Sequence, residues 1–526
     1  MDRPSSELAA PSSEPAAVKA AVRSAEKDRL ATCAFADRVA AAVLGAYRQG
    51  AGAFETERRE AGRQTVVAGI CALDASTEPP TLACVAWGCG TKFLRRELVD
   101  ADPLGARVRD SHAEVLARRG LLHALYAELD ESAALVPGDH GGAAGPQGAA
   151  GGSPSGGDLA LCAERGPRVR LLELVPPSGN GGPELCWRLR SEVTLHLYSS
   201  SQPCGNAAMK RWAKGAPEKQ LPELDALEWP QNLANHARQH WSQQKEGQVA
   251  RLVKKEESFF PPAALGAAPA AAAAAESAQL DPEPIGRADA PPFAEQVLHP
   301  PGTSLPGETI SRTHTCSDKI CRWQCLGLQG GLLAHFIPSP LALSSTTVGR
   351  KFHRACLERA LCCRAQDFEQ PTETLAPEPG SKRRRKPGPR LRPPAGYRVQ
   401  HLAVMSTAVK LDPNTAISTA KDAVHASFDD PRVLWWSAAA TAPEMLDGMT
   451  GLPLEQQPAA SEPAPSAVCS QRLFARFGAL CERTRRDALL AASRPADAKH
   501  ACAAYAQARE ALLTDPYQLG PWQVKG

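Results

Sequence analysis

Low-complexity stretches interrupt this chain of 526 residues, and they constrain its fold more than any other feature. They are rich in Gly, Ala, Pro and Ser and lack the apolar side chains needed to offset the loss of chain entropy, so we expect them to be disordered. They comprise an N-terminal tail at 1–28 and insertions near 136–158, 259–292, 369–395 and 453–467. Between them lie short helical and strand patterns, none of them long enough to be a domain alone, so residues 29–526 are predicted to form a single interrupted domain.

The remaining pieces alternate between strand and helix patterns. Strands are predicted at 63–73, 81–92 and 192–200. Helices are predicted at 113–129, 205–215 and 317–336, and two amphipathic helices at 470–491 and 497–513. This alternation indicates an α/β domain.

The overall charge is nearly balanced. The chain has 60 Lys+Arg against 57 Asp+Glu, so any nucleic-acid surface must be local. Sixteen cysteines would suggest disulfides in a secreted protein, but the N-terminal segment has no apolar core after a basic start. No uncharged apolar run is long enough to cross a membrane. We therefore expect an intracellular protein with reduced thiols that can bind metal, and no membrane association.

The stretch "DSHAEVLARRG" places His112 and Glu114 two residues apart, at the predicted first turn of a helix. An ordinary helix start explains both residues, because Glu114 complements the positive end of the helix dipole and His112 is a polar first-turn residue. H-x-E is also half of the zinc deaminase signature, whose second half is P-C-x-x-C.

That second half is present only in part. Pro203 and Cys204 follow a predicted strand and open a predicted helix, where the amide dipoles favour a thiolate. Ala207 stands where the second cysteine is expected. Either the site is incomplete or its third protein ligand lies elsewhere.

A catalytic zinc site usually has three protein ligands, so a further thiolate is expected downstream. The candidates are Cys316, Cys321 and Cys325. Cys316 is favoured, because a helix can begin just after it, as after Cys204. The other two fall inside that helix and are expected to be core residues. His196 and His314 remain alternatives, although a lone histidine is more often simply hydrogen-bonded.

Four motifs occur in a fixed order: "GCGTK", "DSHAEVLARRGLL", "LHLYSSSQPCGNA" and "CSDKICRWQCLGLQGGLL". From about residue 60 onward the chain resembles the editase-type adenosine deaminase domain, which RNA-editing adenosine deaminases share with the eukaryotic tRNA-specific adenosine deaminase. The resemblance implies a cytidine-deaminase-like zinc core, in which a mixed sheet is flanked by helices, elaborated by C-terminal helices.

The resemblance also implies roles for individual residues. His112, Cys204 and Cys316 would hold one Zn²⁺, and Glu114 would be the catalytic proton shuttle that converts adenosine to inosine and ammonia. Gly90, Thr91 and Lys92 would lie beside the substrate. For this turn a structural reading is equally open, in which Gly90 ends a strand and Lys92 is solvated.

Domains of this family enclose inositol hexakisphosphate, which needs converging cations and donors. By motif alignment its site would comprise Arg118, Arg119, Thr313, Lys319, Arg322, Trp323, Gln329, Lys499, Tyr505, Arg509, Trp522 and Lys525. For Lys499 and Arg509 an equally open interpretation is that the side chains lie on the solvated surface of a helix. The sequence departs from the family pattern at Arg109, Asn206, Gly331 and Leu452, none of which is an expected zinc ligand.

The substrate is expected to be tRNA. Only about sixty residues precede the resemblance, which leaves no room for a duplex-binding module. The tRNA-specific member acts on the adenosine 3′ of the anticodon in alanine tRNA, and we expect a monomer without an obligatory partner. Alternatives are an editor of messenger or double-stranded RNA and an inactive RNA-binding relative.

The basic run 382–386 is either a nuclear signal, an RNA-contacting arm or solvated linker, so the expected location is the nucleus, the cytoplasm or both.

Overall fold

The computed structural model describes residues 16–94, 96–135, 169–175, 185–204, 207, 315–368, 392–412, 430–454 and 464–513. The expected insertions at 136–158 and 259–292 lie outside these residues, as do most of those at 369–395 and 453–467 and of the helix expected at 205–215. The basic run 382–386 and His314 also lie outside them.

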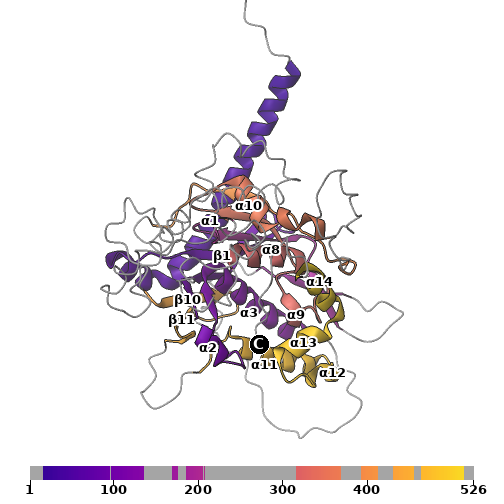
Figure 1. Ribbon diagram of the computed structural model, residues 1–526. Helices are drawn as coiled ribbons and strands as arrows, with labels where there is room; N and C mark the ends of the chain where they lie inside the picture. Colours follow the sequence, from indigo (N-terminus) through magenta and orange to yellow (C-terminus); the bar gives the residue numbers. More distant parts are fainter. Residues whose placement is uncertain are drawn as a thin grey trace, which may run out of the picture.

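One eight-stranded mixed sheet forms the centre of the described fold (Figure 1). Its strand order is β12-β11-β10-β2-β1-β7-β8-β9. The bounds are β1 Val67–Asp74, β2 Thr81–Cys89, β7 Val193–Ser199, β8 Leu343–Val348, β9 Ala403–Ser406, β10 Arg432–Ser437, β11 Glu444–Asp447 and β12 Leu452–Pro453. Strands β7, β8 and β9 run parallel, and the other pairs are antiparallel. The expected mixed sheet is therefore confirmed.

Helices α1 (Ala16–Glu60) and α3 (Ala113–Ala134) pack against opposite faces of this sheet. Strand β1 is buried along nearly its whole length, and its successive side chains enter two different hydrophobic clusters. Ile70 packs in the cluster that contains the apolar side chains of α3, whereas Val67 and Cys71 pack with those of α1. Alternation of side chains along a strand produces this arrangement.

The remaining elements surround the sheet. They are α2 Arg96–Asp100, α8 Cys316–Leu326, α9 Gly330–Leu333, α10 Arg354–Leu361, the 3-10 helix η4 Cys363–Phe368, α11 Ser470–Arg483, α12 Asp487–Leu490, α13 Pro495–Ala501 and α14 Ala503–Leu513. Two small hairpins pair β3 Thr91–Phe93 with β4 Asp110–His112, and β5 Leu172–Val175 with β6 Cys186–Leu189. Figure 1 shows α11, α12 and α13 gathered at one end of the molecule, far from the first turns of α1. No helix of the described ranges is both long and apolar enough to span a membrane.

Several predicted helices are shorter than expected. The helix expected at 317–336 ends at Leu326, because Gly327 adopts a φ of 90° that other residues rarely adopt, and resumes as α9. The helices expected at 470–491 and 497–513 each divide into two. Conversely, α1 begins at Ala16, inside the tail expected to be disordered, where Ala, Glu, Lys and Arg favour helix.

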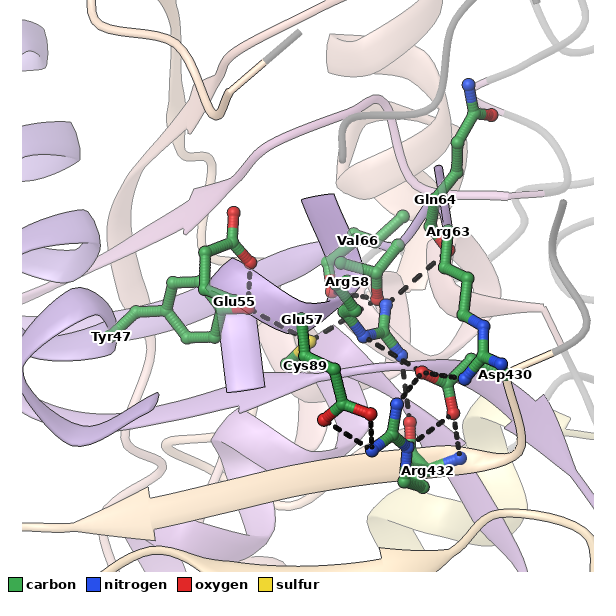
Figure 2. Close-up of polar contacts among 11 residues, drawn as sticks. Tyr47, Glu55, Glu57, Arg58, Arg63, Gln64, Val66, Cys89, Asp430 and Arg432 are labelled. Atoms are coloured by element: carbon green, nitrogen blue, oxygen red, sulfur yellow. Dashed lines mark hydrogen bonds and ion pairs between the residues drawn. The ribbon is translucent and has the colours of Figure 1, made fainter. Parts of the chain in front are cut away.

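A buried ionic bracket joins the end of α1 to β10 (Figure 2). The Arg58 side chain is only 2% exposed, and its Nε lies 3.5 Å from the carboxylate of Asp430, which is 1% exposed. Arg58 also donates to the backbone carbonyl of Arg432, at 2.9 Å. Arg432 in turn pairs with Asp430 and, at the surface, with Glu57. The bracket anchors α1 to the strand at one side of the sheet.

Candidate metal and catalytic site

His112, Cys204 and Cys316 meet at one point, although they come from three distant segments. Their ligand atoms all lie within 4.8 Å of one another, and His112 and Cys316 are buried. The Cys316 amide donates to the Cys204 sulfur at 3.2 Å. One imidazole and two thiols in this spacing are a donor set that fits Zn²⁺.

The local fold explains why these side chains converge. His112 ends β4 and is the extended N-cap residue of α3, while Cys316 is the first residue of α8. Thr315 caps α8 by accepting a hydrogen bond from the Asp318 amide at 3.3 Å. A histidine and a cysteine thus lie at two helix N-termini, whose positive dipole ends favour thiolate ligands.

The two thiols are coupled through a shared hydrogen bond. This contact with Cys316 lowers the pKa of Cys204, and the positive field of His112 and the Cys316 amide act in the same direction. The same contact, together with burial, raises the pKa of Cys316.

The Asp110 carboxylate orients the imidazole. Its Oδ1 lies 2.7 Å from His112 Nδ1 and accepts a hydrogen bond from the His112 amide at 2.9 Å, so Nε2 is the ring nitrogen left for a metal ion. Its other oxygen forms an ion pair with Lys319 on α8. The Phe93 ring stacks on the imidazole, with centroids 5.8 Å apart and planes 6° apart.

Glu114 lies beside the three ligands, in the first turn of α3. It is 3% exposed, and its Oε1 accepts a hydrogen bond from the Ser199 hydroxyl at 3.1 Å. Its carboxylate also contacts Cys316. A buried carboxylate that contacts a metal-binding cluster can move protons to and from a group bound at that cluster.

The GTK turn lies on the same hairpin as His112. Thr91 pairs with His112 and Lys92 pairs with Ser111, so β3 forms one wall of the site. A Cβ on Gly90 would lie 2.4 Å from the Ser111 carbonyl, so close packing requires glycine there. Lys92 is 8% exposed, which excludes the reading in which it is simply solvated.

Arginines from three helices, α3, α8 and α14, form a cluster. Arg118 of α3 is half-buried and lies 5.1 Å over the Trp323 ring, and its buried Nε has no hydrogen-bond partner among the described residues. Arg322 donates to the Tyr505 hydroxyl at 3.5 Å. Arg509 lies close enough to Arg322 for the two positive charges to repel each other. Burial lowers the pKa of Arg118 to about 10, and the neighbouring arginines contribute to the shift.

Other residues expected around a polyanion have different surroundings. Gln329 satisfies backbone groups, accepting from the Leu341 amide at 2.9 Å and donating to two carbonyls. Arg119 donates to the carbonyl of Val468, and Lys499 lies on α13, next to α9. Thr313, Trp522 and Lys525 lie outside the described residues, as does Asn206.

The alternative ligands are not part of this cluster. His196 lies inside β7, with Nδ1 2.8 Å from the Ser345 hydroxyl and Nε2 2.8 Å from that of Thr194. Burial lowers its pKa to about 4. Cys321 and Cys325 are fully buried within α8 and pack in the main hydrophobic cluster, as predicted.

Comparison with known proteins agrees with this site. A family model described as the adenosine-deaminase (editase) domain matches residues 86–137 and 180–526. The chain belongs to the editase-type adenosine deaminase family. The ligand cluster, Glu114 and the GTK turn all fall within the matched ranges.

Relatives of two kinds are similar to this chain. The double-stranded RNA-specific adenosine deaminase of Mus musculus is 27% identical over 280 residues, covering 53% of this chain and 17% of the relative. The tRNA-specific adenosine deaminase 1 of Mus musculus is 22% identical over 334 residues, covering 55% and 58%. That of Homo sapiens is 23% identical over 467 residues, covering 77% and 79%. The chain thus spans less than two thirds of the two mouse relatives.

Three residues of the site were not foreseen from the sequence. Asp110 lies two positions before His112 and had a signal in "DSH", because a ligand histidine usually has an acidic or carbonyl partner. Ser199 and Phe93 carried none, since only the fold brings them to Glu114 and His112.

Proposed function

We propose that this protein is a zinc-dependent hydrolase that converts adenosine in tRNA to inosine and ammonia. The observation that carries the proposal is the convergence of His112, Cys204 and Cys316 within 4.8 Å, with the buried Glu114 carboxylate beside them. A purely structural zinc site usually has four protein ligands and needs no such carboxylate.

The residues divide the work as follows. Zinc held by these three ligands supplies a water that is acidic enough to act as a nucleophile at neutral pH. Glu114 would carry the first proton of the attacking water to the adenine ring nitrogen, and the second, from the hydroxyl formed at C6, to the amine that leaves as ammonia. Ser199 holds the carboxylate, and Asp110 holds the imidazole of His112. The water oxygen becomes the carbonyl oxygen of inosine.

Inositol hexakisphosphate is proposed as a structural cofactor. The Nε of Arg118, which has no hydrogen-bond partner among the described residues, and the neighbouring Arg322 and Arg509 fit a polyanion, because an anion offsets the repulsion between clustered like charges. Mass spectrometry of the denatured full-length chain tests this proposal. A phosphate-rich ligand should be released from the wild type, and soluble yield should fall in Arg118→Ala. Normal folding without such a ligand would contradict it.

The proposed substrate position is the adenosine 3′ of the anticodon in alanine tRNA. The similarity to human tRNA-specific adenosine deaminase 1 over 77% of the chain supports a tRNA substrate. A loop already exposes its bases, so less unstacking is needed than in a duplex. We further propose that the protein acts as a monomer, in the nucleus, the cytoplasm or both.

A second candidate is an editor of other RNA, since the mouse double-stranded RNA-specific deaminase shares 27% identity with the matched region. One experiment separates the two. Purified full-length protein is incubated with tRNA transcripts and with a long RNA duplex, and A-to-G changes are read by reverse transcription and sequencing. Changes confined to one tRNA position support the first proposal. Changes only in the duplex favour the second, and no change in either contradicts both.

A further inference from the structure

A second group of metal-binding side chains lies outside the site described above. Cys362, Cys363 and His401 place their ligand atoms within 4.8 Å of one another. Cys362 is buried, Cys363 is half-buried and His401 is exposed. Together they form a cluster of two sulfurs and one imidazole nitrogen, in which the histidine is the residue exposed to solvent.

Two of the three distances between the ligand atoms match those of a tetrahedral zinc site. With Zn–S near 2.3 Å and Zn–N near 2.05 Å, tetrahedral angles require about 3.8 Å between sulfurs and about 3.6 Å between sulfur and nitrogen. The Cys362 and Cys363 sulfurs lie 3.6 Å apart, and the Cys363 sulfur lies 3.7 Å from His401 Nδ1. These two pairs are already spaced for one ion, and the third pair lies within 4.8 Å.

The backbone explains how two consecutive cysteines face the same point. In a continuous α-helix, neighbouring side chains diverge by about 100°. Cys362 is instead the C-cap residue of α10, with φ −151° and ψ −53°, and η4 begins at Cys363. This break in the helix turns both sulfurs toward His401, which lies just before β9.

We propose that Cys362, Cys363 and His401 bind a second Zn²⁺ ion, independent of the proposed catalytic one. The Cys362 sulfur donates to the Glu358 carbonyl at 3.3 Å, and metal binding would exchange the thiol protons for the ion. Solvent supplies the fourth ligand at the exposed side. Because Cys363 and His401 are 38 positions apart, the ion cross-links η4 to the segment before β9.

Metal counting on the full-length chain tests the proposal. Reduced protein is equilibrated with Zn²⁺, desalted and assayed by mass spectrometry of the metal. The wild type should hold two ions per chain, and Cys363→Ser and His401→Ala should each hold one. Cys502→Ser, which changes a half-buried cysteine outside both clusters, should still hold two.

A second readout identifies the ligands. With Co²⁺ in place of Zn²⁺, the thiolate-to-cobalt absorption should fall in Cys363→Ser but stay that of one complete site. Cys316→Ser should instead lose the ion of the catalytic cluster and keep the second, so failure of one site is distinguishable from failure of the other. His401 is exposed, so His401→Ala remains informative if Cys363→Ser does not fold. A wild type with one ion, unchanged in both variants, would overturn the proposal.

Discussion

The Asp110 carboxylate lies between His112 and Lys319, with one oxygen 2.7 Å from the imidazole Nδ1 and the other paired with the ammonium. The expected metal ligand is therefore held by an ion pair that joins β4 to α8. Because the carboxylate fixes both the tautomer and the direction of the ring, its loss should affect metal binding before it affects the fold.

Replacement Asp110→Asn should weaken zinc binding at the catalytic cluster by about 10- to 100-fold. The amide keeps the shape of the side chain but lacks the charge that stabilises the imidazole. Competition with a chelator measures the affinity, and Asp487→Asn at the exposed start of α12 is the control. Unchanged affinity in Asp110→Asn would show that the carboxylate does not support the ligand.

Replacement Ser199→Ala should lower kcat by about 10- to 100-fold with little change in KM, because a hydrogen bond to a charged group contributes about 1.5–3 kcal/mol. The variant removes the hydroxyl that positions Glu114 without touching the proposed metal ligands. Ser200→Ala is the matched control, since Ser200 accepts from the Val67 amide instead. Steady-state deamination kinetics compare the two, and equal kcat values in both variants would refute the positioning role.

The stability of the protein should fall as the pH is lowered through the range in which unfolded histidine titrates. Burial holds the pKa of His196 at about 4, against about 6.5 in the unfolded chain, so the unfolded state binds the extra proton first. Between these two pKa values, each unit by which the pH is lowered reduces the free energy of unfolding by about 1.4 kcal/mol because of His196. The reduction from pH 7 to pH 5 is about 2 kcal/mol. Urea unfolding of wild type and His196→Asn measures the difference, and parallel pH profiles would disprove it.

Replacement Asp430→Ala should destabilise the protein by about 3–5 kcal/mol, because it leaves the buried Arg58 without its counterion. Figure 2 shows that Glu57 pairs with the same network from the outside, and its side chain is 60% exposed. Glu57→Ala should therefore cost less than about 1 kcal/mol. Urea unfolding measures both, and similar losses in the two variants would contradict the buried bracket.

The sequence predicted the elements whose signals are local. Strand β7 and helix α3 have clear periodicities, and the H-x-E and Pro-Cys motifs identified two of the three clustered ligands. Strands β8 to β12 are short and were not predicted, because they become strands by pairing with neighbours that are distant in sequence.

Contacts between distant residues were beyond sequence reasoning. Asp110 and Lys319 are separated by 209 positions, and the alignment that placed Lys319 at a polyanion gave no sign of this ion pair. The adjacent Cys362 and Cys363 are visible in the sequence, but their convergence on His401 depends on the helix break at Cys362.

Glu114 is proposed to move the protons of a hydrolytic deamination at the cluster of His112, Cys204 and Cys316. The most direct test is Glu114→Gln, which keeps the size of the side chain, assayed with the tRNA that the wild type modifies. Inosine formation should fall by at least about a thousandfold, within the range of general acid–base contributions, while zinc content and unfolding match the wild type. Undiminished inosine formation in a zinc-loaded Glu114→Gln protein would contradict the account.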